Sequence, residues 1–482
     1  MANDFSSIQN SNQIGCIGVP LNSSSTTLKD YLFNQGYDIV YLDYNDGTDD
    51  IKRNATLLEE VIKWVNNNKV GTDPNIVMGI SMGGLVARYA LRDLEKKGYD
   101  HQTKIYLSMD SPHNGANVPV GLQAALCHMR SFGITIDYPA SLITIKPSDY
   151  IKQLKQAFNL LNTMAAKQML IYKVAANSSG ILYYDNSVHE SFMTEYNNLG
   201  FPEKSYNVAI SDGSGDGSSL FAAGTNLISQ NMTYHLESYM ELLSLLLGGS
   251  FIHFSMPELA IISTHPGSTE VKTEFSINST PSTPGNVYHG RVYIRKKIFW
   301  FIKVNVDITN QNFNSTSTMI PIDGASGGIY DINKMTDLSK LPKGTVINQK
   351  QFCFVPTVSA LAANNWENNI SNSSNNISNI SKFQNCYKQA PTINRLHTSF
   401  NTNDYSLANY IKTILDNTSS YCTSNTLIEN VKYTNNQTIT GCNLTLQNIT
   451  IQNNSNVVID ATNNTVINGP FEVITGSSIE IK

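Results

Sequence analysis

Charged side chains are scarce in this chain of 482 residues. Lys, Arg, Asp and Glu together make up 15% of the sequence, whereas globular proteins usually have about a quarter. The net charge is −5, which excludes the broadly basic surface typical of nucleic-acid-binding proteins. Aromatic residues are well represented, and 24 Tyr and 18 Phe can bury more apolar area than a disordered chain would offer. We therefore predict a globular protein that does not bind nucleic acid.

Long apolar runs are also missing. The most apolar short run, Leu242–Leu247, ends at Gly248, well short of the roughly 20 residues that a membrane helix needs. The sequence therefore predicts no transmembrane segment. The first residues, MANDFSSIQNSNQ, lack the basic and apolar regions of a secretory signal, so either the protein stays inside the cell or a signal has been removed.

Motifs for metals and nucleotides are absent as well. The six cysteines form no C-x-x-C, and the sequence contains no G-x-x-x-x-G-K-[ST], H-E-x-x-H or calcium-loop pattern. We therefore predict no metal and no cofactor. If the cysteines form disulfides, proximity favours the pairs Cys422/Cys442 and Cys353/Cys386 among about 15 connectivities.

What the sequence does contain is an alternation of strand-like and helix-like segments between Thr27 and Asp110. Such alternation is typical of an α/β fold with a parallel sheet. Asp49 and Asp50 are candidate N-caps for the first long helix, and Gly98 ends the second. The predicted strands are residues 37–43, 75–79 and 104–109, and the predicted helices are residues 51–68 and 83–97.

The remaining sequence divides by its pattern. Residues 118–203 are mostly helical and predict a cap, and strand character returns at residues 205–210. A hairpin is expected at residues 292–308, a polar loop at residues 364–381, and a short β solenoid near the end. The predicted units are an α/β core (1–220, with the cap at 118–203), a partly β-rich insertion (221–345), the end of the core (346–418) and an accessory β module (419–482).

Gly79-Ile-Ser81-Met-Gly83 matches G-x-S-x-G between a predicted strand and a predicted helix, which is the context of a nucleophile elbow. The turn exposes the serine hydroxyl, and we expect that larger residues at either glycine would collide with neighbouring backbone. We predict Ser81 as a nucleophile and the Met82 N–H as an oxyanion donor. The alternative is a glycine-rich structural turn.

The residues around this elbow resemble α/β-hydrolases of the lipase type. Ser81–Tyr89 is similar to the nucleophile helix of lipases and of lipase-like deacylases, and Asp110–Ala116 is similar to the lipase segment T-P-H-x-G. The resemblance is closest to secreted bacterial lipase-like proteins. It implies an α/β-hydrolase fold and a Ser-His-Asp triad.

A serine hydroxyl needs a histidine base, and in this fold the chain order is Ser, acid, His. His113 lies in the turn beside the elbow, where a structural role is expected. His397 follows Phe354–Leu361, which resembles the lipase segment between the acid and the histidine. We therefore predict His397 as the base, the alternative being a solvated loop histidine.

Two carboxylates remain open for the acid. Asp212 directly follows the strand after the cap, although its glycine-rich surroundings also fit a polar turn or a cation-binding loop. Asp323 lies in a segment, Pro321–Gly328, that resembles D-x-A-x-G-G in related proteins. Asp110 precedes the cap, so we expect it to be a structural or hydrogen-bonding residue, the alternative being the triad acid.

Two functions remain open at this stage. The resemblance implies a serine carboxylic-ester hydrolase with an ester or lipid substrate, transient contact with a lipid surface, and secretion or display at the cell surface. The second oxyanion donor would come from Cys16–Leu21, where Pro20 lacks an N–H. That gap and the uncertain acid leave a secreted binding or adhesion protein on a degenerate hydrolase scaffold as the alternative.

Overall fold

The computed structural model describes most of the chain. The description covers residues 27–131, 134–138, 141–145, 152–214, 217–236, 269–298, 302–332, 344–363, 381–389, 393–398, 406–417 and 425–481. The predicted polar loop at residues 364–381 therefore lies almost wholly outside the described residues, as does Cys16–Leu21.

A four-stranded parallel sheet lies at the centre of the site-bearing part. Its strands are β1 (Asn75–Ile80), β2 (Thr103–Met109), β7 (Tyr206–Ser214) and β15 (Asn385–Gln389), and they pair in the order β1-β2-β7-β15. Parallel strands end at a common edge, so the residues that follow β1, β2 and β7 are brought together. This edge carries the site described below.

The helices predicted before and after β1 are confirmed. Helix α2 (Ile51–Asn68) begins at the N-cap Asp50, whose side chain accepts a hydrogen bond from the Lys52 N–H. Helix α3 (Met82–Lys96) follows the elbow directly. Gly98 has a φ of +75°, a conformation that favours glycine and ends the helix.

The strand predicted at residues 37–43 is wrong. This segment forms no strand in the part of the chain that the structure describes. Val40 and Tyr41 are 54% and 43% exposed, so these side chains are not buried as they would be in a central strand of a sheet. β-branched and aromatic residues favour strands only when a neighbouring strand packs against them.

Helices cover both faces of the parallel sheet. Side chains alternate along β2 and β7, so Leu107 and Ile210 face α1 (Leu28–Asn34) and α13 (Ser406–Asp416). Tyr106 and Ala209 face the opposite side, which packs against α2 and α3. The sheet is therefore a buried middle layer, as its apolar sequence requires.

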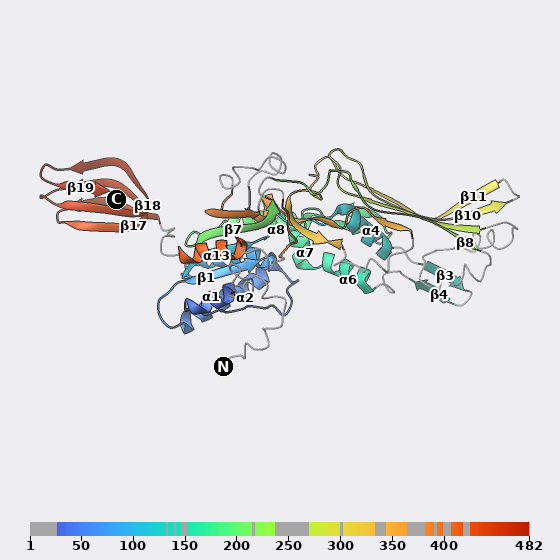
Figure 1. Cartoon of the computed structure of the whole chain (residues 1–482), viewed down its shortest axis with the longest axis horizontal. Coiled ribbons are helices and arrows are strands. Elements are labelled where there is room, and N and C mark those ends of the chain that lie inside the picture. Colours follow the sequence, from blue (N-terminus) through green and yellow to red (C-terminus); the bar gives the residue numbers. More distant parts are fainter. Residues whose placement is uncertain are drawn as a thin grey trace.

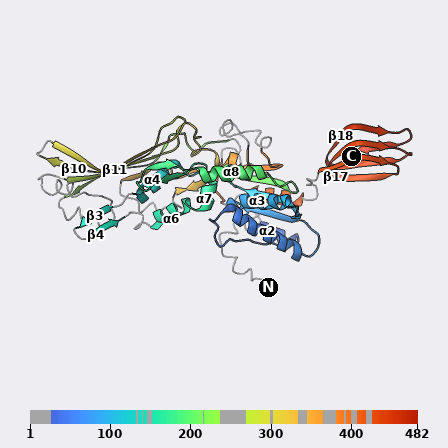
Figure 2. The same cartoon turned by 180° about the vertical axis from the view of Figure 1, so that it is seen from behind.

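The predicted cap contains the expected helices and two hairpins that the sequence did not reveal. Helix α8 packs against α3 on the core, whereas α4 packs against the inserted sheet (Figure 2). The two ends of this segment thus belong to different layers. Its elements are α4 (Val120–Ser131), β3 (Ile134–Tyr138), β4 (Ser141–Ile145), α6 (Lys152–Leu161), α7 (Met164–Met169), β5 (Val174–Ala176), β6 (Leu182–Tyr184) and α8 (Ser187–Leu199).

Arg88 connects α3 to the end of α8. Its guanidinium donates to the carbonyl oxygens of Gly200 (2.8 Å) and Tyr196 (3.1 Å) and lies over the rings of Tyr196 and Phe201. The side chain is 1% exposed, so these contacts replace its hydration.

We expect Arg88→Ala to lower the free energy of unfolding by about 3 kcal/mol, because it opens a cavity and removes the side-chain donors to the carbonyl oxygens of Gly200 and Tyr196. Urea denaturation of the variant and the wild type measures this difference. A change below about 0.5 kcal/mol would contradict the bridging role of Arg88.

The insertion forms a long antiparallel sheet ordered β11-β10-β9-β8-β13. The predicted hairpin at residues 292–308 is confirmed by the pairing of β10 with β11, and its far end marks one end of the molecule in Figure 1. A separate pair, β12 with β14, follows. The strands are β8 (Asn226–Leu236), β9 (Thr269–Asn278), β10 (Asn286–Ile298), β11 (Ile302–Asn314), β12 (Gly327–Asp331), β13 (Thr345–Ile347) and β14 (Gln351–Pro356).

The C-terminal strands form a separate parallel stack, drawn at the opposite end of Figure 1. They are β16 (Asn425–Tyr433), β17 (Gln437–Ile451), β18 (Asn456–Val473) and β19 (Ser478–Ile481), and each pairs with the next. Consecutive parallel strands require the chain to return after each one, which is the geometry of a solenoid. The predicted accessory β module agrees with this arrangement.

The structure can be compared with the two predicted disulfide pairs and with the prediction that the chain has no transmembrane segment. Cys442 is disulfide-bonded, and its predicted partner Cys422 lies outside the described residues. The predicted disulfide Cys353/Cys386 is wrong, because neither cysteine is in a disulfide. Cys353 is buried in β14, and Cys386 lies on β15. Within the described ranges, no helix combines the length and apolarity needed to cross a membrane.

Candidate active site

Ser81 lies at the turn between β1 and α3. Its φ of 53° and ψ of −128° place it outside the usual regions for a residue with a side chain, as in a nucleophile elbow. The Ser81 N–H donates to the carbonyl oxygen of Met109 at the end of β2 (2.9 Å). The serine is partly exposed, so its hydroxyl is within reach of a substrate.

The two glycines of the motif have different roles. A Cβ added at Gly79 would lie 2.3 Å from the Gly83 carbonyl oxygen, whereas a Cβ at Gly83 would meet no atom within 4 Å. The steric expectation is therefore right for Gly79 and wrong for Gly83. The second crowded position is Gly84, where a Cβ would lie 2.0 Å from the Ser111 Oγ.

Gly79→Ala and Gly83→Ala form a matched pair of variants. We expect the alanine at position 79 to displace the elbow and to lower kcat/KM by at least about 100-fold, since about 1 Å of displacement can cost this much. Gly83→Ala should retain activity and gain about 0.5 kcal/mol of stability. Ester hydrolysis and thermal denaturation measure both effects, and a more damaging change at Gly83 would refute the assignment.

His397 is the residue that contacts Ser81. Its Nε2 lies 2.8 Å from the Ser81 Oγ, so the structure brings together the serine and the histidine that the sequence predicted. The backbone N–H of His397 donates to the Ile329 carbonyl oxygen of β12 (2.7 Å). Nearby, the Asn394 side chain accepts from the Gly327 N–H and donates to the Ser218 carbonyl oxygen. These bonds fix the loop that carries the ring.

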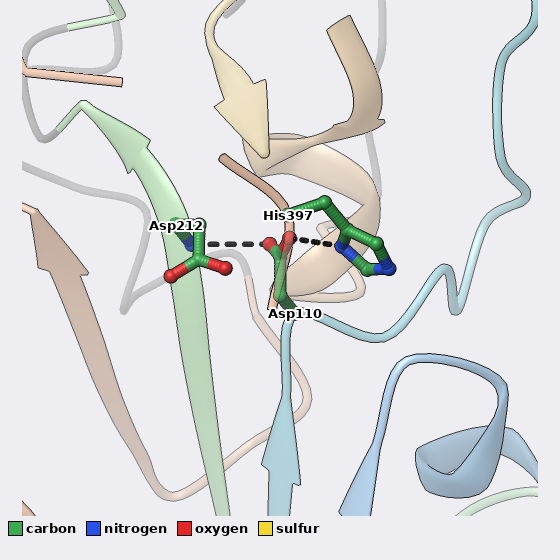
Figure 3. Close-up of side chains that lie close together, drawn as sticks. All are labelled: Asp110, Asp212 and His397. Carbon is green, nitrogen blue, oxygen red and sulfur yellow. Dashed lines mark hydrogen bonds and ion pairs between the residues drawn. The ribbon is translucent and has the colours of Figure 1, made fainter. Parts of the chain in front are cut away.

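Asp110, which was not expected to contact the histidine, is the carboxylate that lies against His397. Its Oδ2 lies 2.7 Å from the His397 Nδ1 (Figure 3). The residue directly follows β2, has a φ of 42° and is 2% exposed. Its position after the strand next to β1 places the carboxylate on the far side of the imidazole from Ser81.

The two predicted acids lie elsewhere. Asp212 follows Ile210 along β7, and its own Oδ2 accepts a hydrogen bond from the Thr398 N–H (3.0 Å). Asp323 accepts hydrogen bonds from the Thr280 N–H and the Asn117 side chain, and it is buried. Neither carboxylate makes a hydrogen bond to the histidine among the described contacts.

The segment that suggested Asp323 contributes to the site through its glycines. A Cβ added at Gly328 would lie 1.9 Å from the Asp110 Oδ2. The backbone of β12 therefore packs directly against the carboxylate that contacts His397. Asp323, five residues earlier in the same segment, has a structural role at the start of β12.

Burial raises the pKa of Asp110 to about 7, although hydrogen bonds from Asp212 oppose this shift. A neutral carboxylic acid cannot accept the His397 Nδ1–H in the way that a carboxylate can. Activity that depends on this contact should therefore fall as the pH drops through about 7.

A second serine–histidine pair lies nearby but lacks the other features of a catalytic site. The His113 Nε2 lies 2.7 Å from the Ser108 Oγ, and its Nδ1 bonds to the Tyr196 hydroxyl and not to a carboxylate. Ser108 and His113 are 0% exposed, so a substrate cannot reach them. Burial also lowers the pKa of His113 well below its usual value, and the structural role predicted for it agrees with this geometry.

The Met82 N–H is the first of helix α3 and has no acceptor within the helix. It lies at the positive end of the helix dipole, next to Ser81, where an oxyanion would form. The predicted second donor, in Cys16–Leu21, lies outside the described residues.

Asp110, Asp212 and His397 are also close enough to share a cation, with one candidate atom from each within 4.8 Å of the others. The hydrogen bonds from His397 and from the Asp212 backbone account for the position of Asp110 (Figure 3). We therefore assign no metal to this group.

Two aromatic side chains of the cap segment, Phe158 and Tyr184, pack in the apolar cluster that borders the insertion. Tyr184 contacts Phe313 of β11, Phe158 borders the same apolar cluster, and Tyr183 is 45% exposed. The aromatic ring nearest the site is Phe354, whose centroid lies 5.0 Å from that of His397.

Comparison with known proteins adds no relative. No family model, no curated protein and no solved structure matches the chain. The function has to be argued from the geometry of the site.

Proposed function

We propose that this protein is a serine hydrolase of carboxylic esters, with Ser81 as nucleophile, His397 as base and Asp110 as the orienting acid. The observation that carries the proposal is the position of the His397 ring, with Nε2 at 2.8 Å from the Ser81 Oγ and Nδ1 at 2.7 Å from the Asp110 Oδ2. This arrangement is the minimum that makes a serine hydroxyl a nucleophile.

In the proposed reaction, the Ser81 Oγ attacks the ester carbonyl while His397 Nε2 takes its proton. The Met82 N–H donates to the developing oxyanion, and His397 then returns the proton to the leaving alcohol. Water repeats the sequence on the acyl-enzyme. Asp110 keeps the Nδ1–H tautomer of the ring and stabilises the imidazolium ion.

The α/β-hydrolase fold is part of this proposal. Its support is the parallel sheet order β1-β2-β7-β15 with the nucleophile after β1, the acid after β2 and the histidine after β15. The chain order Ser81, Asp110, His397 is that of α/β-hydrolases. The alternative function, a binding or adhesion protein on a degenerate hydrolase scaffold, was favoured in part because the acid was uncertain. The contact between Asp110 and His397 removes that reason.

We extend the proposal to an exported esterase that acts on lipid esters in transient contact with a lipid surface. The disulfide at Cys442 supports an oxidising compartment. The polar insertion and the solenoid, both outside the parallel sheet, are compatible with that location.

Hydrolysis of p-nitrophenyl esters of increasing acyl length tests the activity and the identity of the acid together. We expect measurable turnover by the wild type and a fall in kcat of about 10⁴-fold in Asp110→Asn, because the amide favours the wrong histidine tautomer. Asp323→Asn is the matched control, a buried aspartate that does not contact His397, and it should retain most of the activity. Equal rates in the wild type and Asp110→Asn would contradict the proposal.

A further inference from the structure

Asp212 lies against the carboxylate that contacts His397, on the side away from the ring (Figure 3). The Asp212 N–H donates to the Asp110 Oδ1 (3.0 Å), while the other oxygen of Asp110 is held by His397 (2.7 Å). One carboxylate oxygen of Asp110, one of Asp212 and one ring nitrogen of His397 lie within 4.8 Å of one another. Two carboxyl groups this close can form a hydrogen bond with each other only if one of them carries a proton.

The surroundings of the pair disfavour two negative charges. Asp110 and Asp212 are 2% and 4% exposed, and like charges this close raise the pKa of at least one partner. Burial and the charge of Asp110 raise the pKa of Asp212 well above its usual value, while His397 and the Thr398 N–H act in the opposite direction. Among the described residues, the thiol of Cys353 in β14 also lies near Asp110, and burial raises the pKa of this thiol and keeps it neutral.

The division of roles within the pair follows from the contacts. Asp110 accepts from His397, which favours its ionised form, whereas the nearest partner of the Asp212 side chain apart from Asp110 is the Thr398 N–H. The proton therefore belongs on Asp212. Donated to Asp110, it lowers the pKa of that carboxylate and keeps it an acceptor.

We propose that Asp212 is a positioning residue that keeps one proton at neutral pH and donates it to Asp110, so that Asp110 stays ionised and aligned with His397. This inference rests on the proposed hydrolase function for its kinetic consequences, but the shared proton itself does not require catalysis. Two aspartates at the same edge of neighbouring strands, Asp110 directly after β2 and Asp212 within β7, thus act as one singly charged acid.

The pH dependence of kcat/KM separates this role from a structural one. Asp212→Ala removes the donated proton, so we expect the acidic limb of the profile to move up by about one pH unit. Asp212→Asn still donates through its amide, and its acidic limb should match the wild type. At high pH we expect Asp212 of the wild type to lose its proton, so that the carboxylates of Asp110 and Asp212 repel each other and activity falls. Asp212→Asn should lack this decline, because its amide does not ionise.

A residue that only supports the fold would lower activity equally at every pH in both variants, which would overturn the proposal. If Asp212→Ala does not fold, Asp212→Asn still decides the question. An alkaline limb that is unchanged in Asp212→Asn would show that the dissociating proton is not on Asp212.

Infrared spectroscopy tests the proton without any enzyme activity. The difference spectrum between the wild type and Asp212→Asn at pH 7 should contain the carbonyl band of a protonated carboxyl group. The Asp323→Asn difference spectrum is the control for a buried aspartate outside the pair. Absence of the band in the Asp212 difference overturns the inference, whereas a band in a protein that hydrolyses no ester would leave it intact and refute only the proposed function.

Discussion

Ser81→Ala should lower kcat for p-nitrophenyl ester hydrolysis by roughly 10⁶-fold, to a residual rate from oxyanion stabilisation and binding alone. The loss is this large because Ser81 is the only residue here proposed to form the acyl-enzyme. The substitution removes one oxygen atom at a partly exposed position, and the Ser81 N–H keeps its bond to Met109. Folding should therefore be unaffected.

Ser111→Ala is the matched control for this variant. Ser111 is a buried serine directly after Asp110, and its hydroxyl bonds to the Met109 carbonyl oxygen (3.1 Å). Its loss should cost about 1 kcal/mol of stability and less than tenfold in rate. If Ser111→Ala and Ser81→Ala lost equal activity, the elbow serine would have no special role.

His397→Ala should also lower kcat by roughly 10⁶-fold, because a serine hydroxyl without a base is a poor nucleophile. The Nε2 of His397 lies 2.8 Å from the Ser81 Oγ. Residues of one catalytic unit do not contribute additively, so the double variant with Ser81→Ala should be no slower than either single variant. Steady-state rates of the three proteins at equal concentration give this comparison.

His113→Gln provides the control for the histidine variant. This residue belongs to the buried Ser108–His113 pair, and it packs against Tyr196 and Phe383. The substitution should lower the melting temperature and leave kcat within about tenfold of the wild type at temperatures where the protein is folded. A larger loss of kcat in His113→Gln than in His397→Ala would place the base at His113 and contradict our assignment.

The elbow was predictable because it is local. The glycine at position 79, the serine and the following helix lie within one stretch of sequence, and their pattern requires no knowledge of distant contacts. His397 was found from chain order and from the segment that precedes it. What the sequence did not reveal is that Gly84 is crowded and Gly83 is not, because the atoms that crowd Gly84 belong to Ser108 on the next strand and Ser111 after it.

Asp110 was not the predicted acid, because the contact between Asp110 and His397 depends on strand order. Asp110 directly follows β2 and Asp212 lies near the end of β7, and only the pairing of β2 between β1 and β7 shows that Asp110 lies nearer the elbow. We expected the acid to follow the cap at residues 118–203, and Asp110 precedes the cap. A signal was present nonetheless, because a carboxylate directly after the strand next to the nucleophile lies at the same sheet edge as the serine.

Reaction with a serine-directed fluorophosphonate tests the central claim most directly. The activated hydroxyl of Ser81 should form a covalent phosphonyl adduct, located by mass spectrometry of the peptide that contains Gly79-Ile-Ser81-Met-Gly83. His397→Ala, which keeps the serine, should react far more slowly. A folded wild-type protein that is not labelled at Ser81, or that is labelled equally in His397→Ala, would contradict the proposed triad.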